Sequence, residues 1–427
     1  MENCKLPTDL LINILARLPV KPLMRFKSVS KYFYDLIKSD LHFMHKHYEI
    51  SKTKPEHAVI ESGSDKRKVV NLLYKESEFY AIGCRNLDIP LSVYLGIWHV
   101  KCLYGMLCLI VGREDPFYLQ FGKELIYDIV IWNPSTKEIK SLPPLKVPFK
   151  HPHNSPNEPP IRFVMNDGFG FGLCKNMTWK IVCVWNFEFY KDNVFHGIVM
   201  VGSQVGDSWC WREIDAKNIT GVDLYMIEDF YLKGRYYWRV MVQYPALSTY
   251  DRERLLWFDM DDEIFGILEL PSHIGCGLVT PMNETIAFLG YPILANNYQI
   301  EIWLMHEDDN HHFNWHKHTS IDSRLYPDEH PIGIWNHHLL LIPPMPQTDS
   351  FTLDANFVPS LISSDLITGE RDIMYVTEER KNIDIAYNSS GCVRVNFEGN
   401  VQIPRKYRIF HMVGTFVRVY HESLYLP

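Results

Sequence analysis

A repeat of about fifty residues constrains the fold of this chain more than any other feature of its sequence. Short apolar runs that each follow a turn residue begin at Gly105, Gly234, Glu284, His337 and Gly391, and the last four are spaced by 50, 53 and 54 residues. A period of this length, with several strands per unit, is typical of propeller blades of the kelch size. We therefore expect a large all-β domain of roughly six to eight blades. An irregular antiparallel sandwich or barrel is the alternative.

Two further marks recur along the same stretch. Apolar runs that end in tryptophan lie at 129–132, 182–185, 254–257 and 300–303. A strand-turn-strand phrase begins at Asn133, Asp259 and Asp365, where Asn or Asp together with Pro, Thr or Gly favours a tight turn. Both marks support a succession of short antiparallel strands.

The first 48 residues have a different pattern, which predicts a cluster of short helices. Helical spacing places on one face Leu10, Leu11, Ile14, Leu15 and Leu18. Pro19 ends this run, Pro22 suits the first turn of a second helix, and Ser30 and Asp40 are N-cap candidates for two more. So short a unit has more apolar surface than it can bury alone. We expect it to dock on a partner, or else to pack on the rest of the chain.

The stretch LPTDLLINILARLPVKPLMRFKSVSK, residues 6–31, closely resembles the F-box of plant F-box proteins. The resemblance implies docking on the Skp-type adaptor of a cullin-based (SCF) ubiquitin ligase, and through it on the cullin and RING subunits. The residues that would form or support the adaptor-facing surface are Leu6, Pro7, Leu10, Ile14, Leu15, Leu18, Pro19, Leu23, Phe26, Val29 and Phe33. The family commonly has a tryptophan after the Val-Ser-Lys stretch, where this chain has Tyr32-Phe33-Tyr34.

We therefore expect a multidomain chain, in which a small all-α domain precedes a large all-β, propeller-like one. Residues 1–48 would be the F-box, 49–95 a charged connector, and 96–427 the β-rich substrate-binding domain. The aromatic content of 14% favours strands in that body.

Charge is distributed unevenly between the two domains. Residues 1–50 contain 8 Lys+Arg and 5 Asp+Glu, so the rest of the chain holds 35 Lys+Arg against 46 Asp+Glu. An acidic body argues against nucleic acid or an anionic membrane as the direct ligand and favours a basic protein partner. The alternative is that this mild acidity only aids solubility.

Phrases in the body resemble the F-box-associated region of plant F-box proteins. They are Gly105-Met-Leu-Cys-Leu, Trp132-Asn-Pro-Ser-Thr-Lys, Asp167-Gly-Phe-Gly-Phe, Trp211-Arg-Glu-Ile and Tyr420-His-Glu-Ser-Leu. Together they are most similar to the S-locus F-box (SLF) group of self-incompatible plants. That resemblance implies binding of non-self S-RNases, which are basic ribonucleases taken up by the pollen tube, and their ubiquitination and proteasomal degradation.

The cysteines and the apolar runs help to predict the cellular compartment of the protein. Nine cysteines are scattered without a CxxC pair, and neither an apolar leader nor a run of about eighteen apolar residues occurs. We expect reduced thiols in the cytosol or nucleus, with no membrane span.

No cofactor, resident metal or catalytic set is expected. His, Asp and Glu crowd residues 306–318, but their spacing fits no standard zinc ligand set. Neither a G-x-S-x-G elbow nor an H-E-x-x-H motif occurs. The alternatives to an adaptor-bound receptor of S-RNases are a receptor for an endogenous cytosolic protein in signalling, and a propeller enzyme or glycan-binding module.

Substrate specificity is expected in loops between strands, because loop sequences can vary without damage to the sheet. The candidate loops are 148–160, 187–195, 244–254, 306–318 and 343–357. Candidate substrate-binding residues within them are Asn154, Glu158, Tyr190, Tyr244, Tyr250, Asp308, Asp309, Asp349 and Asp354. Any single loop could equally be a plain connector.

Overall fold

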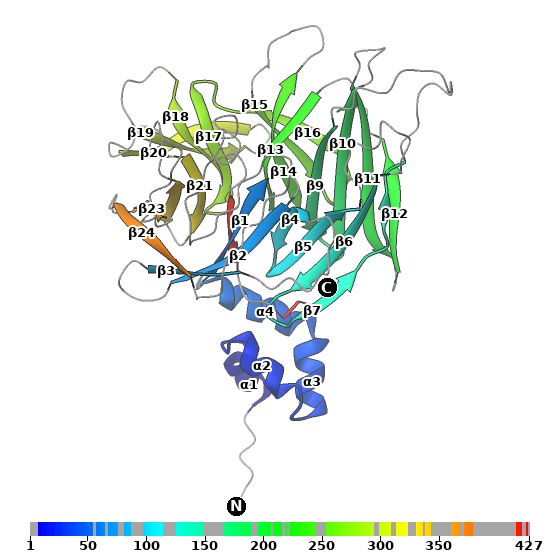
Figure 1. Cartoon of the computed structure of the whole chain (residues 1–427). Helices are drawn as coiled ribbons and strands as arrows, with labels where there is room; N and C mark the ends of the chain where they lie inside the picture. The colour runs from blue at the N-terminus through cyan, green and yellow to red at the C-terminus, as the bar shows by residue number, and fades with distance from the viewer. Residues whose placement is uncertain are drawn as a thin grey trace, which may run out of the picture.

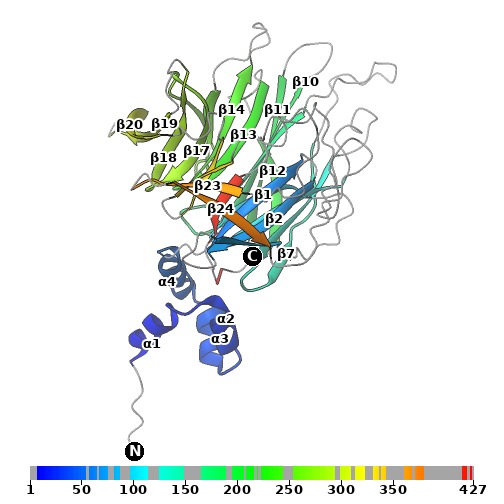
Figure 2. The same cartoon turned by 60° about the vertical axis from the view of Figure 1, so that its left-hand side comes forward.

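The computed structural model describes residues 7–53, 57–64, 67–75, 81–86, 97–113, 125–148, 165–188, 195–205, 208–215, 219, 223–243, 253–293, 299–308, 313–322, 330–335, 338–342, 360–367, 371–378, 416–420 and 424–425. These residues contain four helices and 25 strands, and the structural statements below concern them alone. Figures 1 and 2 show that three helices project from one side of a large body of strands, whereas the fourth lies against it.

Four helices make up the helical segment, residues 8–52. They are α1 (Thr8–Leu15), α2 (Val20–Phe26), α3 (Lys31–Lys38) and α4 (Leu41–Lys52). Both predicted N-caps are confirmed: the Ser30 hydroxyl accepts a hydrogen bond from the Phe33 amide at 3.2 Å, and the Asp40 carboxylate accepts one from the Phe43 amide at 2.9 Å. Pro22 lies in the first turn of α2, as expected.

Twenty-four of the described strands form six antiparallel units of four, which we call blades 1–6. Blade 1 contains β4 (Ile97–Leu103), β5 (Met106–Gly112), β6 (Ile126–Asn133) and β7 (Glu138–Ser141), and β8 (Leu145–Lys146) pairs with β6. Blade 2 contains β9 (Met165–Leu173), β10 (Trp179–Glu188), β11 (Phe195–Val205) and β12 (Ser208–Ile214). Blade 3 contains β13 (Asp223–Leu232), β14 (Arg235–Gln243), β15 (Glu253–Asp259) and β16 (Phe265–Glu269).

The other three blades complete the body. Blade 4 contains β17 (Ile274–Met282), β18 (Thr285–Pro292), β19 (Gln299–Glu307) and β20 (Phe313–Asp322). Blade 5 contains β21 (His330–Trp335), β22 (His338–Ile342), β23 (Ser360–Asp365) and β24 (Arg371–Glu378). Blade 6 contains β25 (Phe416–Tyr420), β1 (His57–Ser64), β2 (Arg67–Lys75) and β3 (Ala81–Asn86).

The blades close into a ring. The first strand of each blade contacts the first strand of the next, in the order β4, β9, β13, β17, β21, β25 and back to β4. Because β25 pairs with β1, strands that are far apart in the sequence close the ring. A parallel pairing of β24 with β3 also joins the outer edges of blades 5 and 6. The predicted propeller-like, all-β body is confirmed, with six blades among the described strands.

The repeated sequence marks correspond to hairpin turns within the blades. The turns before β5, β14 and β18 have two central residues with positive φ, such as Lys233 (φ 47°) and Gly234 (φ 84°). This backbone suits the right-handed twist of the paired strands. The Asn/Asp phrase lies between the third and fourth strands, where the Oδ1 atoms of Asn133, Asp259 and Asp365 accept backbone hydrogen bonds from Ser135, Asp261 and Ile367. The tryptophan mark is less regular, because 182–185 lies in a second strand and the other three runs lie in third strands.

The sequence predicted that residues 57–86 belong to a connector, and the structure differs from this prediction. They form β1, β2 and β3 of blade 6. The charged phrase at residues 62–68, which suggested a linker, includes the end of β1 and the start of β2, where Ser64 pairs with Arg67. Their strand partner β25 lies more than 300 residues away in sequence, so local patterns did not reveal the pairing. The propeller therefore begins before residue 96, and the helical segment extends past residue 48 to Lys52.

Candidate functional site

The helical segment presents apolar side chains to solvent. Leu10 and Ile14 lie one turn apart on α1 and are 48% and 45% exposed, and Val29, before α3, is 63% exposed. Tyr32 and Tyr34 on α3 are also exposed. The residues that the F-box resemblance implies include neither tyrosine, although both flank Phe33.

Ten of the eleven candidate adaptor residues are described, and they divide by burial into three groups. Leu15 and Leu23 are buried in the core of the helical segment, so they can support an interface but cannot form one. Leu18, Phe26 and Phe33 are half-buried, and the last two rings pack 5.9 Å apart. The exposed members are Pro7, Leu10, Ile14, Pro19 and Val29, while Leu6 lies outside the described residues.

An aromatic cluster joins the helical segment to the propeller. Tyr48 on α4 lies 4.8 Å from Tyr104, in the β4–β5 turn, and 6.0 Å from Tyr425. Trp179 on β10 completes the cluster, with its ring 6.0 Å from that of Tyr104. Burial raises the pKa of Tyr48 well above its ordinary value, as expected for a phenol in an apolar junction.

Charged side chains fill the middle of the propeller. On β9, the Asp167 carboxylate lies 3.3 Å from His99 Nε2 and accepts a hydrogen bond from the Tyr127 hydroxyl at 3.1 Å. Burial acts to raise the pKa of Asp167, but these two partners lower it below its ordinary value. On β4, Lys101 donates to Asp229 of β13 and so spans two blade boundaries.

Glu228 on β13 is the central carboxyl most similar to a catalytic acid, because burial raises its pKa. Yet both of its oxygens are engaged. Oε1 lies 3.5 Å from Arg239 Nη2, and Oε2 accepts a hydrogen bond from the Val279 amide at 2.9 Å. The side chain therefore ties blade 3 to blade 4.

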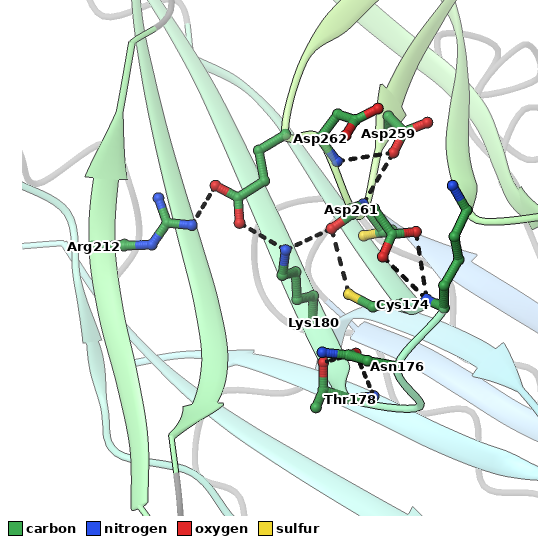
Figure 3. Close-up of polar contacts among 11 residues, drawn as sticks. Cys174, Asn176, Thr178, Lys180, Arg212, Asp259, Asp261 and Asp262 are labelled. Carbon is green, nitrogen blue, oxygen red and sulfur yellow. Dashed lines mark hydrogen bonds and ion pairs between the residues drawn. The ribbon is translucent and has the colours of Figure 1, made fainter.

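A second polar network ties blade 2 to blade 3 at the turns (Figure 3). Lys180 on β10 donates to Glu263 Oε1 at 2.7 Å, and Arg212 on β12 donates to the other oxygen of the same carboxylate. The Lys175 amide donates to Asp261 at 3.1 Å. Partial burial acts to raise the pKa of Glu263, but the two cations lower it below its ordinary value. The network stabilises the turn region of the propeller.

The two ends of the propeller differ in their connections. Three tight turns lie beside the helical segment. The β4–β5 turn contacts it through Tyr104, which packs against Tyr48, and the β6–β7 hairpin contacts it through an ion pair of 3.7 Å between Glu138 and Lys27. At the β9–β10 turn, Met177 lines a cavity of about 100 Å³ together with Leu41 of α4. The longer connections between second and third strands leave from the opposite end, since antiparallel strands alternate in direction.

Most predicted substrate-binding residues lie outside the described residues. These are Asn154, Glu158, Tyr190, Tyr244, Tyr250, Asp309, Asp349 and Asp354, whereas Asp308 is described and half-buried. The strand ends that bound candidate loops 148–160, 187–195, 244–254 and 343–357 lie at the end of the propeller away from the helical segment. The β19–β20 ends that bound 306–318 lie at the helical end, so the structure does not gather the five loops on one face.

Within the described stretches, no group of three or more His, Cys, Asp and Glu side chains is arranged to hold a metal ion. Among the same residues, no helix has the length and apolar character needed to cross a membrane.

Comparison with known families agrees with this architecture. A model of the F-box associated beta propeller domain matches residues 118–397, and a model of the F-box domain matches residues 4–44. The helical segment is thus an F-box, and the strands form the domain that accompanies it. The chain belongs to the family of F-box proteins with an F-box associated beta propeller domain.

The relatives are F-box proteins of Arabidopsis thaliana. At3g10430 is 26% identical over 61% of this chain and 60% of its own length, and the F-box/kelch-repeat protein At3g17530 is 24% identical over 71% and 72%. The chain thus spans less than two thirds of the first of these relatives. Among solved structures, an α-L-arabinanase of Penicillium chrysogenum matches with a TM-score of 0.34 and 11% identity over 68% of this chain and 89% of that one. A TM-score this low supports no argument about function.

Proposed function

We propose that this protein is the substrate-recognition subunit of an SCF ubiquitin ligase and is not itself an enzyme. The F-box would bind a Skp-type adaptor, and through it the cullin and RING subunits, while the propeller holds a protein target. The observation that carries this proposal is the apolar surface at Leu10, Ile14 and Val29, on a segment that matches the F-box model. Exposed apolar side chains gathered on a small unit are typical of a surface that a partner covers.

Such a receptor acts by proximity. It raises the effective concentration of the target's lysines near a ubiquitin thioester carried by another subunit. The transfer chemistry therefore needs no acid or nucleophile in this chain. In agreement, the central carboxylates Asp167, Glu228 and Asp229 are each engaged with a basic side chain and a hydrogen-bond donor.

As the target we propose a basic protein, and within that class a non-self S-RNase. Residues 51–427 hold 35 Lys+Arg against 46 Asp+Glu, and an acidic surface attracts basic partners. The S-RNase assignment rests on the sequence phrases shared with the S-locus group, and a cytosolic signalling protein is the alternative target. We propose the cytosol or nucleus as the location. The side chains of Cys102, Cys108, Cys174, Cys183 and Cys210 are free thiols, as a reducing compartment favours.

The adaptor interaction is tested first, by capture of the full chain on a purified Skp-type adaptor. We expect a complex with the wild-type chain and none with Ile14→Glu, which places a charge in the apolar surface. Ile293→Glu is the matched control, because Ile293 is 61% exposed but lies beside β18 in the propeller. A folded wild-type chain that fails to bind the adaptor would overturn the proposal.

The target is tested by affinity capture with the chain–adaptor complex, from style extract and separately from vegetative extract. Enrichment of a basic ribonuclease from style alone supports the S-RNase assignment. Enrichment of a different protein from both extracts supports the signalling alternative and rejects the S-locus role.

A further inference from the structure

Two residues beyond β25 lie between the F-box and the propeller. Leu424 and Tyr425 are only 1% and 3% exposed. The amide of Asn133 donates a hydrogen bond of 2.9 Å to the backbone carbonyl of Tyr425. Asn133 is itself fully buried and holds the β6–β7 turn through its other side-chain atom, which accepts from the Ser135 amide at 2.9 Å. The position of Tyr425 is therefore fixed by blade 1.

The side chain of Tyr425 contacts both domains at once. Its ring lies 6.0 Å from Tyr48 of α4, 5.6 Å from Tyr104 of the β4–β5 turn and 6.3 Å from Trp179 of β10. These are edge-on contacts, a favourable geometry for aromatic pairs. Its hydroxyl lies 3.2 Å from His45 Nδ1. Burial raises the pKa of Tyr425 to about 12.

The same hairpin of blade 1 also contacts the F-box directly. Lys27, the C-cap residue of α2, lies 3.7 Å from Glu138, the first residue of β7. The β6–β7 hairpin therefore meets the F-box at two points, at α2 through Glu138 and at α4 through the Tyr425 ring that Asn133 holds. Contacts at two separate helices resist rotation of the F-box about either one.

We propose that Tyr425, clamped by Asn133, is a positioning residue that sets the orientation of the F-box relative to the propeller. This inference rests on the proposed function. A receptor that presents a target to a distant thioester gains effective concentration only if the two ends keep a narrow range of relative orientations. Loss of the Tyr425 ring would leave adaptor affinity intact and widen that range.

The experiment measures the distance between the two domains in the full chain, free and bound to the adaptor. Spin labels are introduced through a genetically encoded keto amino acid at the exposed residues His42 of α4 and Ile293 beside β18, which leaves the native cysteines untouched. Double electron–electron resonance then gives a distance distribution. Adaptor affinity is measured in parallel by calorimetry on the same proteins.

Four variants are compared, to separate an effect on the orientation of the F-box from a general loss of stability. Tyr425→Ala removes the ring, and Tyr425→Phe removes only the hydroxyl. Asn133→Ser loses the amide donor to the Tyr425 carbonyl but keeps an oxygen that can hold the turn. Tyr237→Ala is the matched control, because Tyr237 is 4% exposed and stacks 5.2 Å from Phe230 within blade 3, away from the F-box contacts described above.

We expect a narrow distribution for the wild type, Tyr425→Phe and Tyr237→Ala, and a distribution at least twice as wide for Tyr425→Ala, with adaptor affinity unchanged. Asn133→Ser should widen it by an intermediate amount, and it tests the clamp even if Tyr425→Ala fails to fold. A wild-type width in both Tyr425→Ala and Asn133→Ser overturns the inference, as does equal widening in Tyr237→Ala. If the wild type fails to bind the adaptor, the proposed function falls, and the widths in the free chain still decide the role of Tyr425.

Discussion

Truncation of the exposed apolar pair on α1 should weaken adaptor binding without loss of fold. Leu10 and Ile14 are 48% and 45% exposed, so docking can bury only about half of each side chain. Full burial of a leucine or isoleucine contributes about 1.5–3 kcal/mol, and half of that is about 0.7–1.5 kcal/mol per residue. An alanine keeps part of this area, so the double variant Leu10→Ala/Ile14→Ala should lose about 1–2 kcal/mol. That loss corresponds to roughly a 5- to 30-fold weaker Kd.

The assay is calorimetric titration of the full chain with a Skp-type adaptor. Circular dichroism of the free chain checks that the helices persist, since neither side chain belongs to the buried core. Ile267→Ala/Ile293→Ala is the matched control, because these propeller isoleucines are 42% and 61% exposed. An unchanged Kd for the α1 double variant would refute the assignment of this face to the adaptor. Equal weakening in the control would show that the effect is not local.

Three further changes test the supporting structure. Leu23→Ala, at a fully buried site in α2, should cost about 2–5 kcal/mol and lower the denaturant midpoint of helix loss, measured by circular dichroism at 222 nm. Gly234→Ala forces a Cβ into a turn with φ of 84° and should cost about 1–2 kcal/mol in chemical unfolding of the propeller. Glu263 has a lowered pKa beside Lys180 and Arg212, so its stabilising effect is present above its ordinary pKa of 4.5 and is lost as pH falls through the folded value. Glu263→Gln should therefore be less stable than wild type near neutral pH and show a shallower loss of stability below pH 4.5, by unfolding at a series of pH values.

Local sequence signals predicted those parts of the fold that depend on residues close together in the sequence. Ser30 and Asp40 cap α3 and α4 because a side-chain oxygen at that position reaches an amide three residues later. Asn133 and Asp259 mark the turn between third and fourth strands for the same kind of reason. The period of these turns predicted a propeller because each blade repeats the same local chemistry.

Local sequence signals could not predict contacts between residues that are far apart in the sequence. Blade 6 depends on pairing of His57 with Tyr420, and hydrophobic alternation does not identify a strand's partner. The contacts of Tyr425 at the junction and the ion pair of Lys101 with Asp229 could not be predicted for the same reason. Each joins elements that only the closed ring brings together.

The candidate adaptor residues show a different limit of prediction from sequence. The F-box resemblance grouped eleven residues by family position, and only burial separates Leu15 and Leu23, which lie in the core, from Leu10, Ile14 and Val29, which are exposed. A family pattern records both the residues that touch a partner and those that hold the helices in place. The resemblance alone therefore does not separate the residues that would form an adaptor-facing surface from those that would support it.

The strand directions within the blades have a consequence for how a receptor of this kind would work. The F-box contacts the end of the propeller that carries tight turns, and four of the five candidate substrate loops are bounded by strand ends at the opposite end. Strands such as β10, with 10 residues, separate the two ends by roughly 30 Å at about 3.3 Å per residue. A small rotation at the junction is thus magnified at a target held on the far end. The contacts at Tyr425 and at Lys27–Glu138 lie at this junction, where, under the proposed function, an orientation error would be most costly.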